Sequence, residues 1–255
     1  SVYAHCLRED GTLGAPDNEP STTYVPDDNF EQALIDLGYD DVLNDSVLTA
    51  NISGVTSLDV NDKSISDLTG IEAFTALTWL ECHYNQLDSL DVSGNIALTT
   101  LYCAENQLTS LDVSSNTALS GLHCWGNQLT SLDVSNNTAL TNMVFNSNQL
   151  DSLDVSNNTA LTHLYCAENQ LTNLDVSNNT ALEVLHCNYN QLTYLNMKNG
   201  VTDQLTDFNA TNNSLTCIEV LDPAWTTANW TSDSGNIDTG VSFDVICGAE
   251  AQTHW

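Results

Sequence analysis

Strongly basic residues are nearly absent from this chain. Its 255 residues include 3 Lys and Arg against 34 Asp and Glu, for a formal net charge of -31. Nucleic acid is therefore an improbable partner, because binding to phosphates depends on lysine and arginine. Anionic membrane surfaces are disfavoured for the same reason. Such acidity keeps a secreted protein soluble and suits a saline habitat or bound calcium.

Long hydrophobic runs and catalytic motifs are also missing. No stretch approaches the roughly 18 consecutive apolar residues of a membrane-spanning helix. No Gly-x-Ser-x-Gly, HExxH or P-loop motif occurs. Glu81, Glu105 and Glu168 have the chemistry of an acid or base, but an open surface excludes water poorly and shifts pKa values little. We predict a non-catalytic protein. The chain has no signal peptide and begins at Ser1, so we expect a processed or recombinant fragment.

A repeat dominates what is present. Its template is L-x-x-L-x-C-x-x-N-Q-L-x-x-L-D-V-S-x-N-x-A, and its first leucine recurs every 21 residues at Leu77, Leu98, Leu119, Leu140, Leu161 and Leu182. A fixed period of this length is typical of stacked-repeat folds. The alternation around Leu101 and Cys103 predicts a short strand with one face inward. Stacking would bury the apolar edges in one continuous core, with parallel strands about 4.8 Å apart.

Two columns of the template have structural interpretations. The asparagines are expected to hydrogen-bond inward-facing backbone groups where the chain turns; they are Asn85, Asn106, Asn127, Asn148, Asn169, Asn190 and Asn213. The cysteines are expected to be small buried hydrophobes; they are Cys82, Cys103, Cys124, Cys166 and Cys187, with Phe145 and Ala210 in two other turns. Side chains in register on parallel strands lie too far apart for disulfides, and the paired CxxC motifs of a zinc site are absent.

The unit LxCxxNQLTxLDVSxNTAL resembles the leucine-rich repeats of the internalin J-like, cysteine-ladder type, and is similar to repeats in many secreted Bacteroidota proteins. The resemblance covers about residues 23–247. It implies a curved, right-handed solenoid with short parallel strands on its concave face and an irregular convex side. It also implies extracellular placement, a binding role and a reduced, structural cysteine ladder. The repeats alone imply no particular ligand.

The ends of the chain are expected to differ from the repeats. We divide it into an irregular leader (1–23), an N-terminal cap (24–54), the repeats (55–216), a C-terminal cap (217–248) and a tail (249–255). The N-terminal cap should contain a helix that starts near Asp27, buries Phe30, Ala33, Leu34 and Leu37, and ends at Gly38. Cys217 and Cys247 lie outside the ladder, and we expect them to form a disulfide in a cap with Trp225 and Trp230. The last turn, which starts at Leu205, lacks the DVS segment, and Cys6 has no assigned partner.

Function is expected at the variable positions that flank the inward residues of each strand. These positions hold four of the six histidines, together with tryptophans, tyrosines and carboxylates. Exposed aromatic residues on one face favour a binding surface. Rings beside carboxylates and amides suit either a sugar or a protein. The candidate ligand-binding residues are Trp79, Glu81, His83, Tyr84, Tyr102, Glu105, His123, Trp125, His163, Tyr165, Glu168, His186 and Tyr189.

Several alternatives remain beside this interpretation. The aromatic residues would merely pack against cross-strand neighbours if Tyr102 lies beside His123 and Tyr165 beside His186. Two other functions are considered. The chain could be a carbohydrate-binding accessory module of a polysaccharide-degrading system, or its rows of threonines could bind ice or a mineral surface. We expect no metal or cofactor, with calcium between neighbouring aspartates as the alternative; these are Asp91, Asp112, Asp133, Asp154 and Asp175. The expected protein is a secreted or cell-surface monomer that recognises a protein or glycan.

Overall fold

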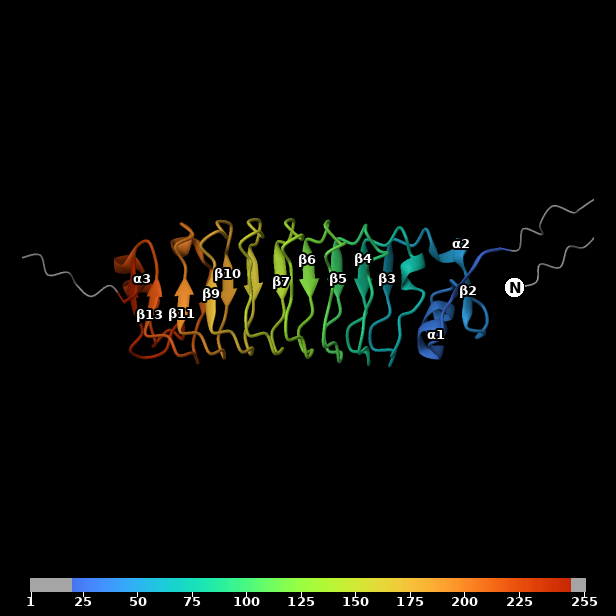
Figure 1. The fold of residues 1–255 in the computed structure, drawn as a ribbon, viewed down its shortest axis with the longest axis horizontal. Helices are drawn as coiled ribbons and strands as arrows, with labels where there is room; N and C mark the ends of the chain where they lie inside the picture. The colour runs from blue at the N-terminus through green and yellow to red at the C-terminus, as the bar shows by residue number, and fades with distance from the viewer. Residues whose placement is uncertain (1–19, 249–255) are drawn as a thin grey trace, which may run out of the picture.

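The computed structural model describes residues 20–248, which wind into a long row of stacked turns (Figure 1). Eight turns each contribute one strand to a parallel sheet in the order β12-β10-β8-β7-β6-β5-β4-β3. The central residues of neighbouring strands are in register, as in the pairs Leu80 with Leu101 and Leu101 with Leu122. The strands are β3 (Ser57–Asp59), β4 (Trp79–Glu81), β5 (Thr100–Tyr102), β6 (Gly121–His123), β7 (Asn142–Val144), β8 (His163–Tyr165), β10 (Val184–His186) and β12 (Asp207–Asn209).

A second parallel sheet forms where the C-terminal turns return across the solenoid. It has the order β14-β13-β11-β9 and consists of β9 (Asn173–Asp175), β11 (Tyr194–Asn196), β13 (Cys217–Glu219) and β14 (Ser242–Asp244). The side predicted to be irregular is therefore regular in this part. Between two earlier turns, the same side forms a single parallel bridge, which joins Asp91 and Asp112. The last turn lacks the DVS sequence, as noted above, but Ile218 and Val220 occupy the buried places of the Leu and Val of that segment.

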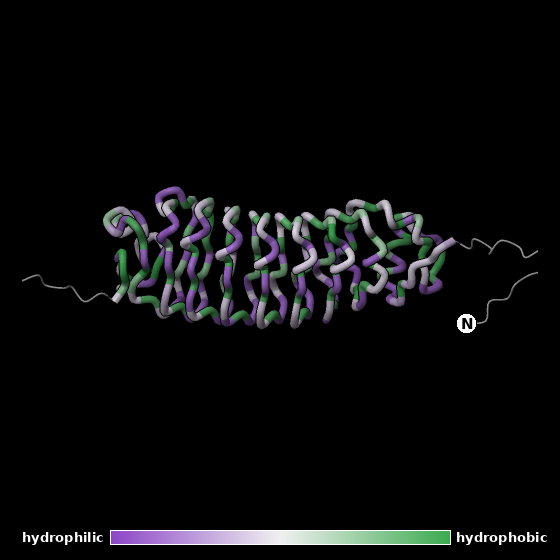
Figure 2. Tube along the Cα trace, turned by 45° about the horizontal axis from the view of Figure 1, so that its top comes forward, coloured by the Kyte–Doolittle hydropathy of each residue, from purple (hydrophilic) through white to green (hydrophobic). Residues whose placement is uncertain are grey.

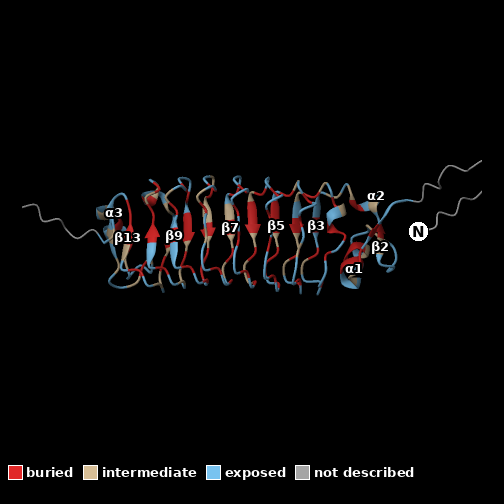
Figure 3. Ribbon diagram, in the orientation of Figure 1, coloured by how far each residue is buried: buried red, intermediate tan, exposed pale blue. Residues whose placement is uncertain are grey.

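The core is one continuous file of inward-pointing side chains. Leu101 and Cys103 are completely buried, as the repeat predicts, and so are their counterparts in the neighbouring turns. Hydrophobic and hydrophilic stretches alternate within the turns, and buried segments recur along the row (Figures 2 and 3). Burial raises the pKa of the Cys82 and Cys124 thiols to about 12, because the thiolate would lose its hydration. All five ladder cysteines are free.

Asparagine side chains connect successive turns. The Asn106 amide donates to the carbonyls of Cys82 and Cys103 at 3.0 and 3.2 Å, and its oxygen accepts from the Leu87 N–H at 3.0 Å. This confirms the structural role predicted for the column. A second buried asparagine column went unrecognised in the sequence, although its asparagine belongs to the template; its members are Asn95, Asn116, Asn137, Asn158 and Asn179. The Asn116 amide, for example, donates to the carbonyls of Val92 and Asn95, both at 2.9 Å.

The N-terminal end carries a helix, α1 (Asp28–Asp36). Its N-cap is Asp27, whose carboxylate accepts from the N–H groups of Asn29 and Phe30. The Phe30 ring lies 6.4 Å from that of Phe74, between centroids, so the helix packs against the first turns. Leu37 was expected to be buried, but it is 45% exposed because it is the C-cap, beyond the last helical turn.

Short elements complete the N-terminal end. Strand β1 (Thr22–Tyr24) pairs antiparallel with β2 (Ser46–Leu48), which leads into α2 (Thr49–Ile52). Strand β1 thus begins inside the range assigned to the leader. Cys6 and residues 249–255 lie outside the described part of the chain.

The C-terminal end is held by the predicted disulfide between Cys217 and Cys247, which have a Cα–Cα distance of 5.7 Å. Trp230 is buried against Phe208, with ring centroids 4.2 Å apart, whereas Trp225 is only half-buried. The remaining elements are α3 (Pro223–Asn229) and two 3-10 turns, η1 (Ile71–Ala73) and η2 (Thr202–Gln204). Among residues 20–248, no helix is long and apolar enough to cross a membrane.

Candidate recognition surface

The outward residues of the eight-stranded sheet, with the two variable residues that follow each strand, form a surface that we call the sheet face. The last variable residue of each turn has a left-handed backbone conformation. Glycine and asparagine adopt this conformation readily, whereas other residues pay for it in conformational energy. The position is occupied by Asp62, Tyr84, Glu105, Gly126, Ser147, Glu168, Tyr189 and Asn212.

Aromatic rings from β4 to β6 meet on the sheet face. The Tyr102 ring lies 5.3 Å from Trp79 and 4.3 Å from His123, between centroids. Trp79 and Tyr84 remain 38% and 50% exposed, so this cluster is open to solvent. We call it the aromatic patch, and it contains Trp79, Glu81, His83, Tyr84, Tyr102, Glu105, His123 and Trp125.

Polar contacts fix the orientation of part of the patch. The Trp79 indole Nε1 donates to Glu81 Oε1 at 2.8 Å, which leaves the other carboxylate oxygen near His83 Nδ1 at 3.9 Å. Partial burial lowers the pKa of His123, because the imidazolium would lose hydration beneath its neighbours. Burial thus favours the neutral form of the His123 ring, which packs against Tyr102 as an aromatic neighbour.

A second contact in the patch spans two turns. The Tyr84 and Trp125 rings approach edge to face, with centroids 6.0 Å apart and planes at 82°. Between their turns lies Ala104, whose small side chain is buried. The Glu105 side chain lies over Gly126, since a Cβ added to this glycine would be 2.9 Å from Glu105 Oε1. Glycine at this position therefore leaves room for a carboxylate beside Trp125.

The remaining candidate residues form a separate group, because Val144 in β7 interrupts the row of aromatic rings. The Tyr165 ring lies 5.1 Å from His186, whose Nε2 lies 2.8 Å from Asp207 Oδ2. Asp207 was not among the predicted site residues. His163 lies beside Tyr165, with ring centroids 6.4 Å apart. The thirteen predicted residues thus lie on one face but do not form one cluster.

Two candidate residues lie at the rim of this second group. The Glu168 carboxylate accepts from the Ser147 hydroxyl at 2.8 Å. Tyr189 is 56% exposed and has no aromatic contact within the described residues.

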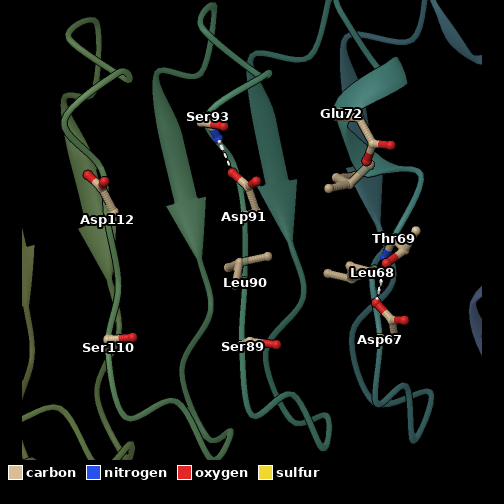
Figure 4. Close-up of a pocket in the computed structure, with 11 residues that line it drawn as sticks. Asp67, Leu68, Thr69, Glu72, Ser89, Leu90, Asp91, Ser93, Ser110 and Asp112 are labelled. Atoms are coloured by element: carbon tan, nitrogen blue, oxygen red, sulfur yellow. Dashed lines mark hydrogen bonds between the residues drawn. The ribbon is translucent and has the colours of Figure 1, made fainter.

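A shallow hollow occurs away from the sheet face, between η1 and the two turns that follow it (Figure 4). Its carboxylates belong to local turns: Asp91 accepts from the Ser93 N–H at 2.9 Å, and Asp67 accepts from the Thr69 N–H at 2.8 Å. Hydrogen bonds from Ser93 also lower the pKa of Asp91. Each aspartate of the column Asp91, Asp112, Asp133, Asp154 and Asp175 accepts such a bond, so the column supports its local turns.

Potential metal-ligand geometry occurs elsewhere. Within residues 20–248, the single group of three or more such ligands is Asp28, Glu31 and Asp45 in the N-terminal cap. Glu31 is buried, and its carboxylate already accepts from the backbone N–H groups of Asn44 and Ser46. The Glu31 carboxylate therefore stabilises the loop before β2 through these hydrogen bonds.

Stacked 21-residue turns, one parallel strand from each turn, and ladders of buried asparagine and cysteine together define a leucine-rich-repeat solenoid of the cysteine-ladder type. No profile of a known protein family matches the chain. The chain is 38% identical to internalin J of Listeria monocytogenes over 84 residues, which are 33% of this chain and 9% of internalin J.

Solved structures of Listeria monocytogenes proteins are also similar to this chain. The functional domain of InlJ from Listeria monocytogenes, which includes a cysteine ladder, matches with a TM-score of 0.60 and 34% identity over 78% of this chain and 52% of the domain. An internalin (InlF) of the same species matches with a TM-score of 0.51 and 21% identity over 82% of this chain and 74% of InlF, a likeness of fold alone. The chain thus spans about half of the InlJ domain that it resembles.

Proposed function

We propose that this chain is a non-catalytic extracellular recognition or adhesion module that binds a protein or glycan on its sheet face. The observation that carries the proposal is the aromatic patch, where large rings are held at the surface of a rigid sheet. Clustered exposed Trp and Tyr residues are typical of interaction sites, because they supply contact area at little cost in side-chain entropy.

Backbone conformation gives the proposal a second support. Tyr84 and Tyr189 occupy left-handed positions while 50% and 56% of their surface stays exposed. They therefore incur a conformational cost with little burial in return. Costs of this kind are concentrated at functional sites. The similarity to internalin J and to its cysteine-ladder domain supports placement at the cell surface or in the extracellular medium.

Cross-strand packing explains only part of the patch. The predicted contacts of Tyr102 with His123 and of Tyr165 with His186 are present. The sheet therefore accounts for these half-buried rings. It does not account for Trp79 and Tyr84, which keep large exposed surfaces.

Substitution of Trp125 by alanine tests the proposal. We expect Trp125→Ala to weaken binding to ligands found on a glycan array or in a screen of purified cell-surface proteins. Its free energy of unfolding should stay within about 1 kcal/mol of the parent, as for other surface changes. Ile96→Ala is a matched control, because Ile96 is an apolar residue that is 65% exposed outside the sheet face. Unchanged binding of every ligand by the Trp125 variant would contradict the proposal.

A further inference from the structure

We propose that the aromatic patch binds a basic segment of a polypeptide, and that one lysine or arginine side chain lies against the Tyr84–Trp125 pair with Glu105 as its counter-ion. The inference rests on the proposed function, since it names the class of partner for the same surface. Three features support it: the sign of the surface charge, the geometry of the rings and the position of the carboxylate.

Charge on the sheet face is strongly one-sided. Carboxylates occur there in most turns, at Asp59, Asp62, Glu81, Glu105, Glu168 and Asp207. Of the two Lys and Arg residues in the described part of the chain, Lys63 lies in the first turn and Lys198 is paired with Glu219 on the second sheet. A basic partner would be attracted by this field and by the net charge of -31, whereas a neutral sugar would gain nothing from either.

The rings have an arrangement that suits a cation. A lysine ammonium or arginine guanidinium is attracted to the face of a Trp or Tyr ring within about 6 Å of its centroid. Tyr84 and Trp125 meet edge to face at 6.0 Å above the buried Ala104. Tyr84 is 50% exposed and Trp125 is partly exposed, so a ligand can reach both side chains.

The carboxylate needed for a charged ligand lies beside the same rings. Glu105 is exposed, and its side chain rests over Gly126, the residue that follows Trp125. The left-handed backbone conformation of Glu105, with a φ of 49°, costs conformational free energy. A cation held by rings and a carboxylate gains both cation–π and charge-assisted hydrogen-bond energy.

The first experiment uses a fluorescent peptide of alternating arginine and glycine, titrated with the full chain and followed by anisotropy. Tyr84→Asn and Trp125→Ala leave the net charge unchanged, so they separate the rings from the general attraction of an acidic protein. We expect each variant to raise the Kd by about three- to thirty-fold, the range of one cation–π contact. Circular dichroism and thermal melting of each variant would verify that it is folded.

A charge-matched pair completes the test. Glu105→Gln and Asp133→Asn each remove one negative charge, but Asp133 is an exposed residue of the aspartate column, away from the sheet face. We expect Glu105→Gln to weaken binding several-fold more than Asp133→Asn. Binding of the parent should also fall as salt is raised from 50 to about 300 mM, because exposed charges are screened.

Other outcomes distinguish this inference from the proposed function. Equal binding of the peptide by the parent, Trp125→Ala and Glu105→Gln proteins would overturn the inference and show attraction by the whole acidic chain. If a neutral glycan or an acidic protein binds in a Trp125-dependent way while the basic peptide does not, the recognition surface stands and its assignment to a basic partner is wrong. If Trp125→Ala binds every ligand as well as the parent does, both the inference and the proposed function are contradicted.

Discussion

Replacement of Tyr189, which has a left-handed backbone conformation, by asparagine should stabilise the folded protein. A residue other than glycine pays roughly 1–2 kcal/mol for this conformation, and asparagine tolerates it better than tyrosine. Tyr189 has a φ of 53° and is 56% exposed, so its removal sacrifices little buried surface. We therefore expect Tyr189→Asn to increase the free energy of unfolding by about 1 kcal/mol, which raises the Tm by about 2–4 °C in a chain of this size.

Calorimetry and urea denaturation would measure the change, and a reciprocal substitution provides the control. Gly126 has a φ of 66° and faces the Glu105 carboxylate, so Gly126→Ala should lose about 1 kcal/mol or more. If Tyr189→Asn is instead less stable than the parent, the tyrosine contributes packing that outweighs its strain. That result would remove the backbone argument for a functional role of this column.

Three further predictions concern the ladders and the C-terminal end. Asn106→Ala should cost about 1–3 kcal/mol in urea denaturation, because it leaves buried backbone groups without partners. Reduction of the Cys217–Cys247 disulfide, which closes a 30-residue separation, should cost about 3–4 kcal/mol and loosen the cap, as reported by tryptophan fluorescence. The hydrogen bond from Lys198 lowers the pKa of Glu219 below its usual 4.5, so this pair stabilises the cap above pH 4.5 and stops doing so as the pH falls further. A Glu219→Gln protein that kept the same acid transition in fluorescence would contradict this assignment.

The repeat period predicted the main sheet because each turn has the same packing problem. Leu101 and Cys103 alternate with Tyr102, which identifies the buried face of β5 without any tertiary information. The second sheet was harder to predict, since the LDV segments look alike in most turns yet form a continuous sheet only from β9 onward. At β13 the sequence reads Cys-Ile-Glu-Val, and the substitutions hide its relationship to the template.

The sequence also predicted which residues reach the sheet face, but not how they group there. Variable positions stand out against fixed columns, so Trp79, Tyr84 and Trp125 could be identified by residue type alone. Contact between Tyr84 and Trp125 depends on the small Ala104 between them and on a left-handed backbone at Tyr84. The alanine is visible in the sequence, but the backbone conformation that brings the two rings together over it is not. The separate group around Tyr165 and Asp207 likewise required the strand register.

The asparagine links in this solenoid join neighbouring turns: Asn106, for example, bonds to its own turn and to the turn before it. Duplication or deletion of one 21-residue unit would therefore leave distant units intact. A change of this kind near β7 would move the two aromatic groups apart or together by about 4.8 Å, the spacing of strands. Duplication or deletion of whole repeats in the gene would thus adjust, in steps of one strand spacing, the distance between the two aromatic groups. The spacing could then match two contact points on a partner while the packing of the core stays the same.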